Sequence, residues 1–471
     1  MMNKQLKTKI LQNPAKYAAG LVVAGWGLTW MSRTIFKKAF GNAVSHIMTD
    51  KYHKNLWEFV SATTKVGPQT IVETNLRSEY GLSPNRPLGT PRNLPNFDNL
   101  MFNFAQLSDS PIPLNTPVDT RTVIGPLAKR PLILNTPIII AGMAYGLALS
   151  ERTKVALAIG SSLANTATNT GEGPFLESER KAAKKLILQY NRGSWSKGPD
   201  VLSQVDMVEI QLGQGAMGAL GHVMKAKEID AKLRRRLGLK PGQDAISHAF
   251  MPGMNHPRDL KKIVDQVRRM SNGVPVGVKI AAGKNLEIDL DWILEAGVDF
   301  IAIDTAQGGS KGTPPLLQDD FGLPNIYALC RTTNHLIKRG MKNKVSIIIS
   351  GGLTTPGHFL KALALGADGI YIGSIALFAM AHTTVLKALP YEPPTQVVWY
   401  DGDFQEKIKP RQAGQYLGNF INACTQEMSE GARALGKNSI HKVDLSDMFA
   451  LDEGTANLVG VPLASEPAID Y

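Results

Sequence analysis

The sequence predicts an α/β fold centred on a TIM-type (β/α)8 barrel, with an N-terminal arm and a C-terminal helical extension. Eight short apolar runs alternate with helix-like stretches between about residues 136 and 379, which is typical of parallel strands buried on both faces. Glycine and polar residues follow several of these runs, where the loops of such a barrel carry its function. A doubly wound open sheet is the competing layout.

The strands are expected where a short apolar run is bounded by turn residues. The eight runs are TPIIIAGM, SSLANTAT, VDMVEIQLG, DAISHAF, VPVGVKI, DFIAIDT, VSIIISGG and DGIYIGS. The stretches between them repeat apolar residues with the spacing of a helix, as in SERTKVALAIG, SERKAAKKLILQY and HPRDLKKIVDQVRRM. These alternating patterns place the barrel over residues 136–385.

Residues 1–49 form a basic, apolar N-terminal segment with no acidic residue. Its uncharged run from Tyr17 to Met31 is shorter than the ~20 residues that a membrane-spanning helix needs. Trp26 and Trp30 suit a membrane interface. We therefore expect membrane association through residues 17–31, on the cytoplasmic side, with a soluble apolar helix as the alternative.

Residues 50–135 are rich in proline, for example in SPNRPLGTPRNLPNF, and show no long periodic segment. We expect an extended arm or cap over the barrel, because ordered loops of this length are uncommon unless they pack on something. Residues 386–471 include RQAGQYLGNFINACTQEMSEGARALG, which has helical spacing. We expect this C-terminal extension to pack against the barrel or against a second copy in a homo-oligomer.

Composition excludes several classes of protein. The net charge of +12 comes partly from the N-terminal segment, and no nucleic-acid-binding motif is present, so we expect no nucleic-acid partner. The two cysteines, Cys330 and Cys424, exclude a disulfide framework and a cysteine-bound iron–sulfur cluster. Cys330 lies in a helical pattern and is interpreted as a packed thiol. His248 and His256 are too loosely spaced for a zinc motif, so we expect no metal.

Two glycine-rich turns predict a phosphate site. SGGLTTPGHF follows the seventh run with Ser350, Gly351 and Gly352, and YIGSIALF follows the eighth with Gly373 and Ser374. The loops after the last two strands of such a barrel, together with a helix N-terminus, commonly bind phosphate. The alternative is that these glycines serve only as ordinary turns between strand and helix.

Charged and amide side chains end three other runs. Lys279 ends VPVGVKI, and a buried lysine is costly unless it meets an anion. We interpret it as a cation beside a flavin ring, or as the partner of Asp304 in an ion pair at the barrel mouth. Asp304 and Gln307 open a glycine-rich loop. Gln211 and Gln214 end the third run, where amides suit the edge of a heteroaromatic ring.

The stretch NTATNTGEGPF, residues 165–175, brackets Glu172 between two glycines. One interpretation is a helix start, because Pro174 suits a first helical turn, and Glu172, Glu177 and Glu179 suit the positive end of the helix dipole. That interpretation leaves Thr168 and the other small polar residues at the strand end unexplained. The second interpretation places Glu172 at the barrel mouth on the substrate side of a flavin, because a carboxylate would repel phosphate.

Together these motifs resemble the flavin domain of the glutamate synthase family. The cues, in family order, are GMAYGLALS, ATNTGEG, EIQLGQGA, PVGVKI, DTAQGGSKGTPP, ISGGL and GADGIYIGS. They span about residues 136–379. The resemblance implies a TIM-type barrel that binds FMN, in which electrons delivered to FMN reduce 2-iminoglutarate formed from 2-oxoglutarate and ammonia.

The resemblance also implies roles for individual residues. The family's flavin contacts fall on Ala144, Thr168, Gln211, Lys279, Gly351, Gly352, Gly373 and Ser374. The acidic residue of the family's GEG loop falls on Glu172, near flavin and substrate. Glu172 and Lys279 are thus the expected catalytic residues, and the expected substrate contacts are Gln214, Asp304 and Gln307.

The sequence departs from the family at three places. The stretch after the eighth run, ALFAMAHTTVLKALPYEPPT, lacks the cysteines that hold the family's iron–sulfur cluster. Met1 is followed by an apolar segment, where glutamate synthases begin with a cysteine amidotransferase domain, so we do not expect glutamine hydrolysis. Gln211 and Met217 stand where the family has lysines, at least one of which helps to set the oxoacid environment.

The expected function is that of an FMN-dependent oxidoreductase acting on an amino-acid or imino-acid substrate of the CH–NH2 type. Its expected partners are a small-molecule substrate and an electron donor, either ferredoxin-like or linked to NAD(P)H. The alternative is a non-redox phosphate-binding barrel, such as an isomerase or a ligand-binding scaffold at a membrane.

Overall fold

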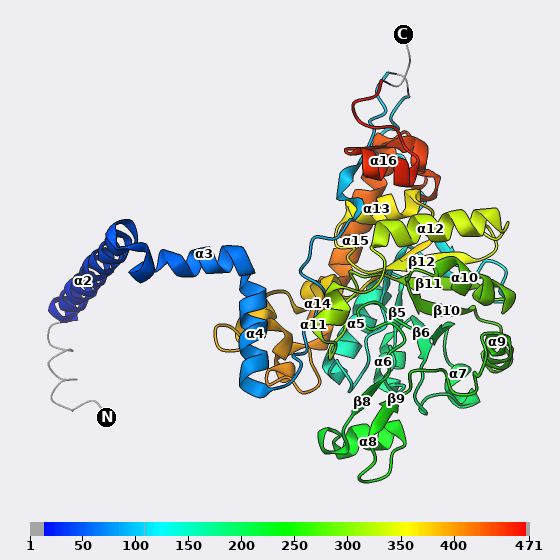
Figure 1. The fold of residues 1–471 in the computed structure, drawn as a ribbon, viewed down its shortest axis with the longest axis horizontal. Helices are drawn as coiled ribbons and strands as arrows, with labels where there is room; N and C mark the ends of the chain where they lie inside the picture. The colour runs from blue at the N-terminus through cyan, green and yellow to red at the C-terminus, as the bar shows by residue number, and fades with distance from the viewer. Residues whose placement is uncertain (1–13, 108, 468–471) are drawn as a thin grey trace. The chain divides into compact units, whose positions relative to one another are not determined.

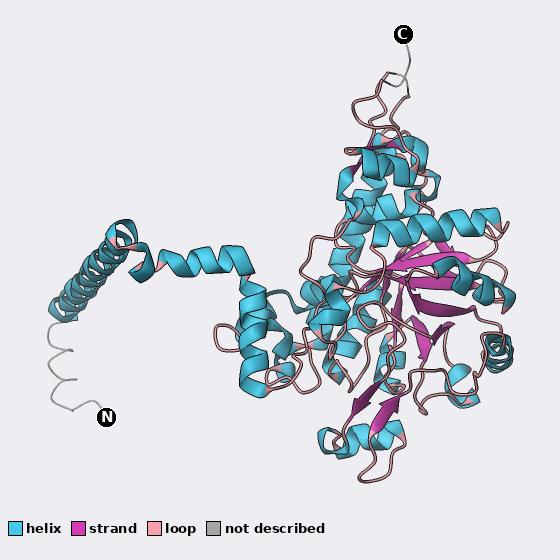
Figure 2. Cartoon of the chain, in the orientation of Figure 1, coloured by secondary structure: helices cyan, strands magenta, loops and turns pink. Residues whose placement is uncertain are grey.

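The computed structural model describes the backbone of residues 14–107 and 109–467, and the side chains from Trp30 onward within these ranges. The chain divides into two compact units, Met1–Pro84 and Asn85–Tyr471. The first unit is helical in its described part, and the second contains every described strand (Figures 1 and 2).

Within residues 14–84, the first unit has the helices α2 (Pro14–Thr49), α3 (Trp57–Val66) and α4 (Pro68–Tyr80) and the 3-10 turn η1 (Tyr52–Lys54). Pro68 opens α4 at a position where its missing N–H costs no hydrogen bond. The prediction of an extended arm is therefore wrong for α3 and α4. Their sequences, WEFVSATTKV and PQTIVETNLRSEY, are rich in β-branched and polar residues, which weaken the helical pattern.

α2 contains the apolar run that we expect to associate with a membrane. Among residues 14–107 and 109–467, no helix is both long enough and apolar enough to cross a bilayer. The side chain of Trp26 lies outside the described part, and that of Trp30 is exposed.

The second unit is built on an eight-stranded parallel sheet with the strand order β4-β13-β12-β11-β10-β7-β6-β5. Its strands are β4 (Ile138–Ile140), β5 (Ala167–Asn169), β6 (Lys185–Tyr190), β7 (Met207–Gln211), β10 (Val276–Ala281), β11 (Phe300–Asp304), β12 (Ser346–Ser350) and β13 (Gly369–Ile372). The two terminal strands, β4 and β5, lie next to each other, and the Thr166 hydroxyl donates to the Ile138 carbonyl at 2.6 Å. The sheet is therefore nearly closed, which confirms the barrel rather than an open doubly wound sheet.

One of the eight predicted barrel strands is wrong, and one true strand is missed. DAISHAF contributes β9 (Ala245–Ser247), which pairs with β8 (His222–Met224) in a separate antiparallel sheet. KLILQY is predicted to be the end of a helix but forms strand β6. The preceding helix, α6, is short and spans only Glu177–Ala182. A short apolar run cannot be told from a buried helix by periodicity alone. The VDMVEIQLG run is consequently the fourth barrel strand.

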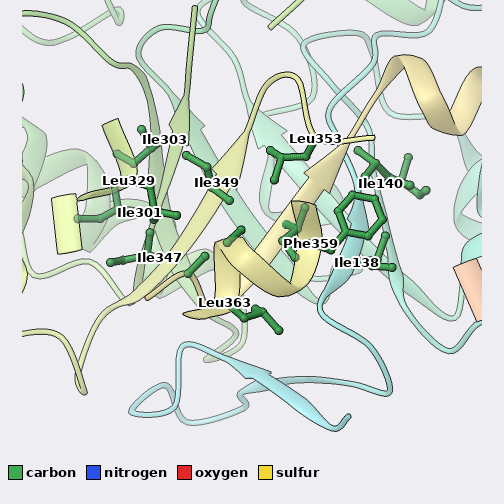
Figure 3. Packing of buried hydrophobic residues seen from close by; sticks show 14 of the residues in the cluster. Ile138, Ile140, Ile301, Ile303, Leu329, Ile347, Ile349, Leu353, Phe359 and Leu363 are labelled. Carbon is green, nitrogen blue, oxygen red and sulfur yellow. The ribbon is translucent and has the colours of Figure 1, made fainter. Parts of the chain in front are cut away.

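Helices fill most of the connections between the strands. They are α5 (Glu151–Leu163), α6, α7 (Pro199–Leu202), α8 (Ala231–Leu237), α9 (Asp259–Met270), α10 (Leu286–Glu295), α11 (Pro315–Asp319), α12 (Asn325–Lys338), α13 (Pro356–Ala364) and α14 (Ser374–Ala381). The isoleucines on the outer face of the strands, such as Ile301 and Ile347, share one buried cluster with Leu329 of α12 and Phe359 of α13 (Figure 3). Burial of each such side chain stabilises the fold by about 1.5–3 kcal/mol.

The barrel interior is apolar at one end and polar at the other. Its apolar layer contains Ile139, Ile348 and Tyr371 together with Ile124 and Leu134. The last two come from the hairpin of β2 (Thr122–Ile124) and β3 (Leu132–Leu134), which is therefore packed against the amino ends of the barrel strands. Side chains alternate between the two faces of a strand. The next inward positions, toward the carboxyl ends, carry polar residues, and these build the site.

The C-terminal extension packs against the barrel, chiefly through α15 (Pro410–Ala434), whose Leu417 and Ile421 are buried in the outer cluster with Leu157 of α5. β1 (Leu100–Phe102) pairs antiparallel with β14 (Met448–Ala450). This pairing joins the segment that precedes the barrel in the sequence to the segment that follows it. The remaining elements are η2 (Phe97–Asn99), η3 (Ala226–Glu228), η4 (His382–Lys387), η5 (Pro394–Val397), η6 (Gln405–Lys407), η7 (Ile440–Lys442), η8 (Leu445–Asp447) and α16 (Glu453–Val459).

Candidate functional site

A cavity of about 990 Å³ lies at the carboxyl ends of the barrel strands. Its wall brings together most of the predicted site residues, namely Ala144, Glu172, Gln214, Lys279, Asp304, Gln307, Gly351, Gly352, Gly373 and Ser374. The segment that contains Asn85, Leu88 and Thr90 completes one side of the wall. Thr168 and Gln211 are not on the wall.

The GEG loop after β5 is held by close backbone packing. Gly171 has a φ of 65°, and a Cβ there would lie 2.5 Å from the Ala144 nitrogen. A Cβ on Gly173 would lie 2.6 Å from the Tyr145 carbonyl oxygen. Only glycine fits at both positions, so the glycines let this loop lie directly against the loop after β4.

The helix-start interpretation is confirmed for Glu177 and Glu179, which lie in the first turn of α6, and is wrong for Pro174 and Glu172. α6 begins at Glu177, so neither Pro174 nor Glu172 lies in its first turn. Glu172 instead lines the cavity and is 9% exposed. Its backbone carbonyl accepts a hydrogen bond from the Trp195 indole at 2.8 Å. The loop is thus fixed from both sides, with the carboxylate directed to the cavity wall.

The partners of the Glu172 carboxylate come from the extra sheet β8–β9. The Ser247 hydroxyl donates to Glu172 Oε2 at 3.3 Å, and His222 Nδ1 lies 3.7 Å from Oε1. These two residues are separated from Glu172 by 50 or more positions in sequence. The run DAISHAF is predicted to be a barrel strand, and in that place it would not bring Ser247 and its pairing partner His222 to Glu172. Sequence reasoning misses both for that reason.

Lys279 and Asp304 form a buried ion pair at the ends of the neighbouring strands β10 and β11. Lys279 Nζ lies 2.9 Å from Asp304 Oδ2, and the two side chains are 3% and 9% exposed. Burial alone would lower the pKa of Lys279, but the carboxylates of Asp304, Glu209 and Glu172 outweigh burial and raise it. Asp304 Oδ1 is buried and has no hydrogen-bond partner among the described residues.

Glu209 of β7 is a second buried carboxylate, and sequence reasoning misses it. It accepts hydrogen bonds from Asn169 at 3.1 Å, from Gln189 at 2.7 Å and from the Tyr371 hydroxyl at 2.7 Å. Burial, and next the Glu209 charge, raise the pKa of Tyr371 well above its usual range. A single glutamate within an apolar run is the one signal of such a site in the sequence.

Gln211 lies beside Lys279 in the sheet register and is fully buried. Its Oε1 accepts a hydrogen bond from Arg192 Nε at 3.1 Å, whereas its Nε2 has no partner among the described residues. Arg192 is itself buried, which lowers its pKa, and donates to the carbonyl groups of Ala219, Leu220 and Ala249. Arg192 therefore positions Gln211 and the loop after β7.

Thr168 lies on the opposite face of its strand. Its neighbours Ala167 and Asn169 belong to the barrel interior, since Ala167 is in the interior cluster and Asn169 bonds Glu209. Because side chains alternate, Thr168 is directed toward the surrounding helices. Its hydroxyl is buried without a partner among the described residues. The barrel-interior position at this strand end is therefore Asn169, which is fully buried and bonds Glu209.

The two predicted phosphate turns both line the cavity. Gly351 has a φ of 106°, and a Cβ there would lie 2.3 Å from the Thr305 hydroxyl oxygen. Gly373 is the N-cap residue of α14, which begins at Ser374. The two turns thus present backbone without bulky side chains to the cavity, next to a helix N-terminus.

Two other predictions concern cysteine and metal chemistry. Burial raises the pKa of Cys330 to about 12, and it likewise raises the pKa of Cys424 to about 12. Both thiols are free and buried. Cys330 is therefore a packed thiol, as predicted. Across residues 14–107 and 109–467, no group of histidine, cysteine and acidic side chains is arranged to hold a metal ion.

Comparison with known proteins identifies the family. Residues 103–438 match the conserved region in glutamate synthase. A glutamate synthase large subunit-like protein of Rhizobium meliloti (strain 1021) is 31% identical over 84% of this chain and 93% of its own length. An archaeal glutamate synthase (NADPH) of Archaeoglobus fulgidus is 30% identical over 74% of this chain and 72% of its own length.

Among solved structures, a flavocytochrome b2 variant with benzoylformate aligns with a TM-score of 0.49 at 17% identity, over 79% of this chain and 80% of that chain. The family match covers more than half of the sequence, including every strand of the barrel. The chain belongs to the glutamate synthase family.

Proposed function

We propose that this protein is an FMN-dependent oxidoreductase of the glutamate synthase type, acting on an amino-acid or imino-acid substrate. The observation that carries the proposal is that Lys279, Glu172 and the two glycine turns line one cavity. A buried cation suits a flavin ring, and a carboxylate suits its substrate. A turn that presents backbone N–H groups beside a helix N-terminus suits a phosphate.

The residues of the cavity fit FMN. The turns at Gly351–Gly352 and Gly373–Ser374 would hold the phosphate through backbone N–H groups, because bulky side chains are absent there. Gln211 Nε2 lies off the cavity wall but next to Lys279 in the sheet, and it has no partner among the described residues, so it would be a hydrogen-bond donor for the ring edge. Lys279 would lie beside the ring, and Ala144, which also lines the cavity, adds only a methyl group there. When bound, FMN supplies two-electron oxidation and reduction.

The chain's own residues hold charge and move protons. Lys279 is kept protonated by Asp304, so its ammonium group stabilises negative charge on a neighbouring group. Glu172 binds the substrate or exchanges a proton through its carboxylate, whose Oε1 faces His222. Gln214 and Gln307 lie on the same wall as candidate substrate contacts. Gln307 also accepts a hydrogen bond from the Asn325 N–H at 2.9 Å, which orients its amide.

The electron donor is proposed to be linked to NADPH. Several similar proteins, including that of Archaeoglobus fulgidus, carry NADPH in their names. NADPH therefore replaces a ferredoxin-like donor as the first candidate to test.

The test is reduction and reoxidation of the flavin in the purified protein. The FMN-loaded protein is mixed without oxygen with NADPH, and separately with single amino acids, while its absorption is followed. Bleaching by one of them is the expected result. The non-redox barrel would be favoured if no donor bleached the flavin and if a Lys279→Ala variant kept full activity in isomerising a phosphorylated ligand.

A further inference from the structure

The cavity has two lysines at different depths. Among the described residues of its wall, the lysines are Lys279 and Lys311, and no arginine is present. The Lys279 side chain is 3% exposed and is paired with the buried Asp304. The Lys311 side chain is 24% exposed, and its ion-pair partner Asp401 is 67% exposed. Lys311 is therefore at the rim of the cavity, where a molecule that enters from solvent meets it.

Lys311 belongs to the glycine-rich loop that follows β11, and this loop reaches over the mouth of the barrel. The neighbouring Ser310 Oγ lies 3.8 Å from the sulfur of Met217, in the loop after β7. The acidic partner of Lys311 directly follows Tyr400, whose N–H donates to the Ala148 carbonyl at 2.9 Å, in the loop after β4. In the sheet, β10 lies between β11 and β7, whereas β12 and β13 lie between β11 and β4. Contacts in both directions around the barrel place Lys311 over its mouth.

The ring of Trp399 holds the Lys311 ammonium group in place without neutralising it. Lys311 Nζ lies 4.8 Å from the centre of the ring, a distance at which the face of an indole attracts a cation. Trp399 also lines the cavity. Because the ring has no net charge, the ammonium group keeps its full charge and its position when its anionic partner changes.

The ion pair between Lys311 and Asp401 is of the kind that is easily exchanged. An ion pair at an exposed position contributes little stability, because water screens the charges and two long side chains lose freedom. Water solvates the released carboxylate of Asp401, whose side chain is 67% exposed. A ligand carboxylate inside the cavity is partly removed from water, so it gains more from the same ammonium group. Such a ligand can displace Asp401.

We infer that Lys311 binds the carboxylate of the substrate, and that Asp401 occupies Lys311 until the substrate displaces it. This inference rests on the proposed function, because an amino-acid or imino-acid substrate carries a carboxylate. It adds the residue that recognises this group. The turns at Gly351–Gly352 and Gly373–Ser374 remain the proposed site of the FMN phosphate, so the two anions have separate partners.

The experiment measures ligand binding by calorimetry on the full-length protein incubated with FMN. The probes are L-glutamate and 2-oxoglutarate, because similar proteins are named glutamate synthases. Lys311→Met is expected to weaken binding of the probe by at least about tenfold, through loss of a charge-assisted hydrogen bond. Asp401→Asn is expected to strengthen it by about two- to fivefold, because the competing carboxylate of an exposed pair is removed.

The opposite directions of the two effects distinguish recognition from a structural role. Both substitutions break the same ion pair. If the pair served only to hold the loop after β11, both variants would lose the same contact, and neither would bind the probe more tightly than the wild type. Asp401 is exposed, so its substitution by asparagine tests the inference without disturbing a packed side chain.

Lys284→Met is the matched control. It removes the same charge from an exposed lysine in the loop after β10, the neighbour of β11, and Lys284 is not on the cavity wall. The affinity for the probe is expected to stay at the wild-type value. An equal loss in Lys284→Met and Lys311→Met would assign the effect to net charge and overturn the inference.

The affinity for FMN is measured in the same variants and is expected to be unchanged. Loss of FMN affinity in Lys311→Met to the same extent as probe affinity would assign the lysine to the phosphate and overturn the inference. Weaker or unchanged probe binding in Asp401→Asn, or no binding of either probe to the wild type, would overturn it too. A protein that binds FMN without these shifts contradicts this inference alone. A protein that shows both shifts but binds no FMN contradicts the proposed function alone.

Discussion

Lys279 Nζ lies 2.9 Å from Asp304 Oδ2, across the ends of two neighbouring strands and away from water. Removing one partner of a buried pair leaves an uncompensated charge, which costs about 3–5 kcal/mol. Lys279→Met is therefore expected to lower the free energy of unfolding by about 3–5 kcal/mol in urea denaturation. A Lys279→Met, Asp304→Asn double variant should lose less than the sum of the single losses. Strict additivity would show that the two side chains do not interact.

The same ion pair predicts how the free energy of unfolding depends on pH. The pKa of Lys279 is raised above its ordinary 10.5, because the nearby carboxylates outweigh burial. A raised lysine pKa gives stability that is fully present below 10.5 and is lost as the pH rises through the higher value of the folded state. Unfolding measured from pH 7 upward should thus show the wild-type advantage over Lys279→Met persisting to about pH 10. An advantage that disappears near neutral pH would contradict this assignment.

Gly173 tests the backbone packing that positions Glu172. A Cβ at this position would meet the Tyr145 carbonyl at 2.6 Å, so Gly173→Ala must displace backbone. We expect a loss of about 1–3 kcal/mol in unfolding free energy, as overpacking typically costs. Gly283→Ala is the control, because a Cβ at Gly283 would meet no atom within 4 Å. The packing account is wrong if the two variants are equally stable.

Lys197 lies in a second cavity, of about 630 Å³, which it shares with Lys181 and Arg236. Its Nζ is 4.6 Å from the centre of the Tyr190 ring, and burial lowers the pKa of Lys197 to about 8. At pH 8 a large share of this amine is neutral and nucleophilic. Limited acetylation followed by peptide mass spectrometry should label Lys197 before the exposed Lys181. Earlier labelling of Lys181 would contradict this prediction.

A lowered lysine pKa also has a defined effect on stability. Between about pH 8 and 10.5 the unfolded chain holds a proton on Lys197 that the folded chain lacks, so stability rises with pH there. The gain is lost as the pH falls through about 8. Lys197→Met should remove this rise, and an unchanged pH profile in the variant would assign the rise to other groups.

Cys330 and Cys424 are predicted to be unreactive in the folded protein. Both are buried, and burial raises the pKa of each thiol to about 12, so almost no thiolate forms at pH 8. A thiol reagent such as DTNB should titrate neither cysteine in buffer and both in urea. Rapid reaction of the native protein would show that one of them is accessible.

The barrel is predictable from sequence because its strands are short apolar runs with turn residues at their ends. KLILQY escapes prediction because the charged, helix-favouring stretch SERKAAKK precedes it and extends the helical pattern into β6. DAISHAF is misassigned because a strand's partner is set by tertiary structure and not by local sequence. The helices α3 and α4 are missed because their residues have weak helical preference.

The site is predictable where residues end strands and follow the geometry of the barrel, as Lys279 and Asp304 do. Glu209 and Arg192 are missed because a charged residue in or beside an apolar run is a weak signal, which does not tell which residues the charge meets in the fold. Thr168 is wrongly predicted to contact the flavin because an error of one position along a strand moves a side chain to the opposite face. His222 and Ser247 are brought to Glu172 only by the separate sheet β8–β9.

The most direct test of the account is the cofactor content of the purified full-length protein. Its visible spectrum is recorded as isolated and after incubation with FMN and removal of the unbound flavin, and the released flavin is identified by chromatography. The account predicts one FMN per chain, and a loss of FMN affinity in Lys279→Met. A protein that retains no flavin after incubation with FMN would contradict it.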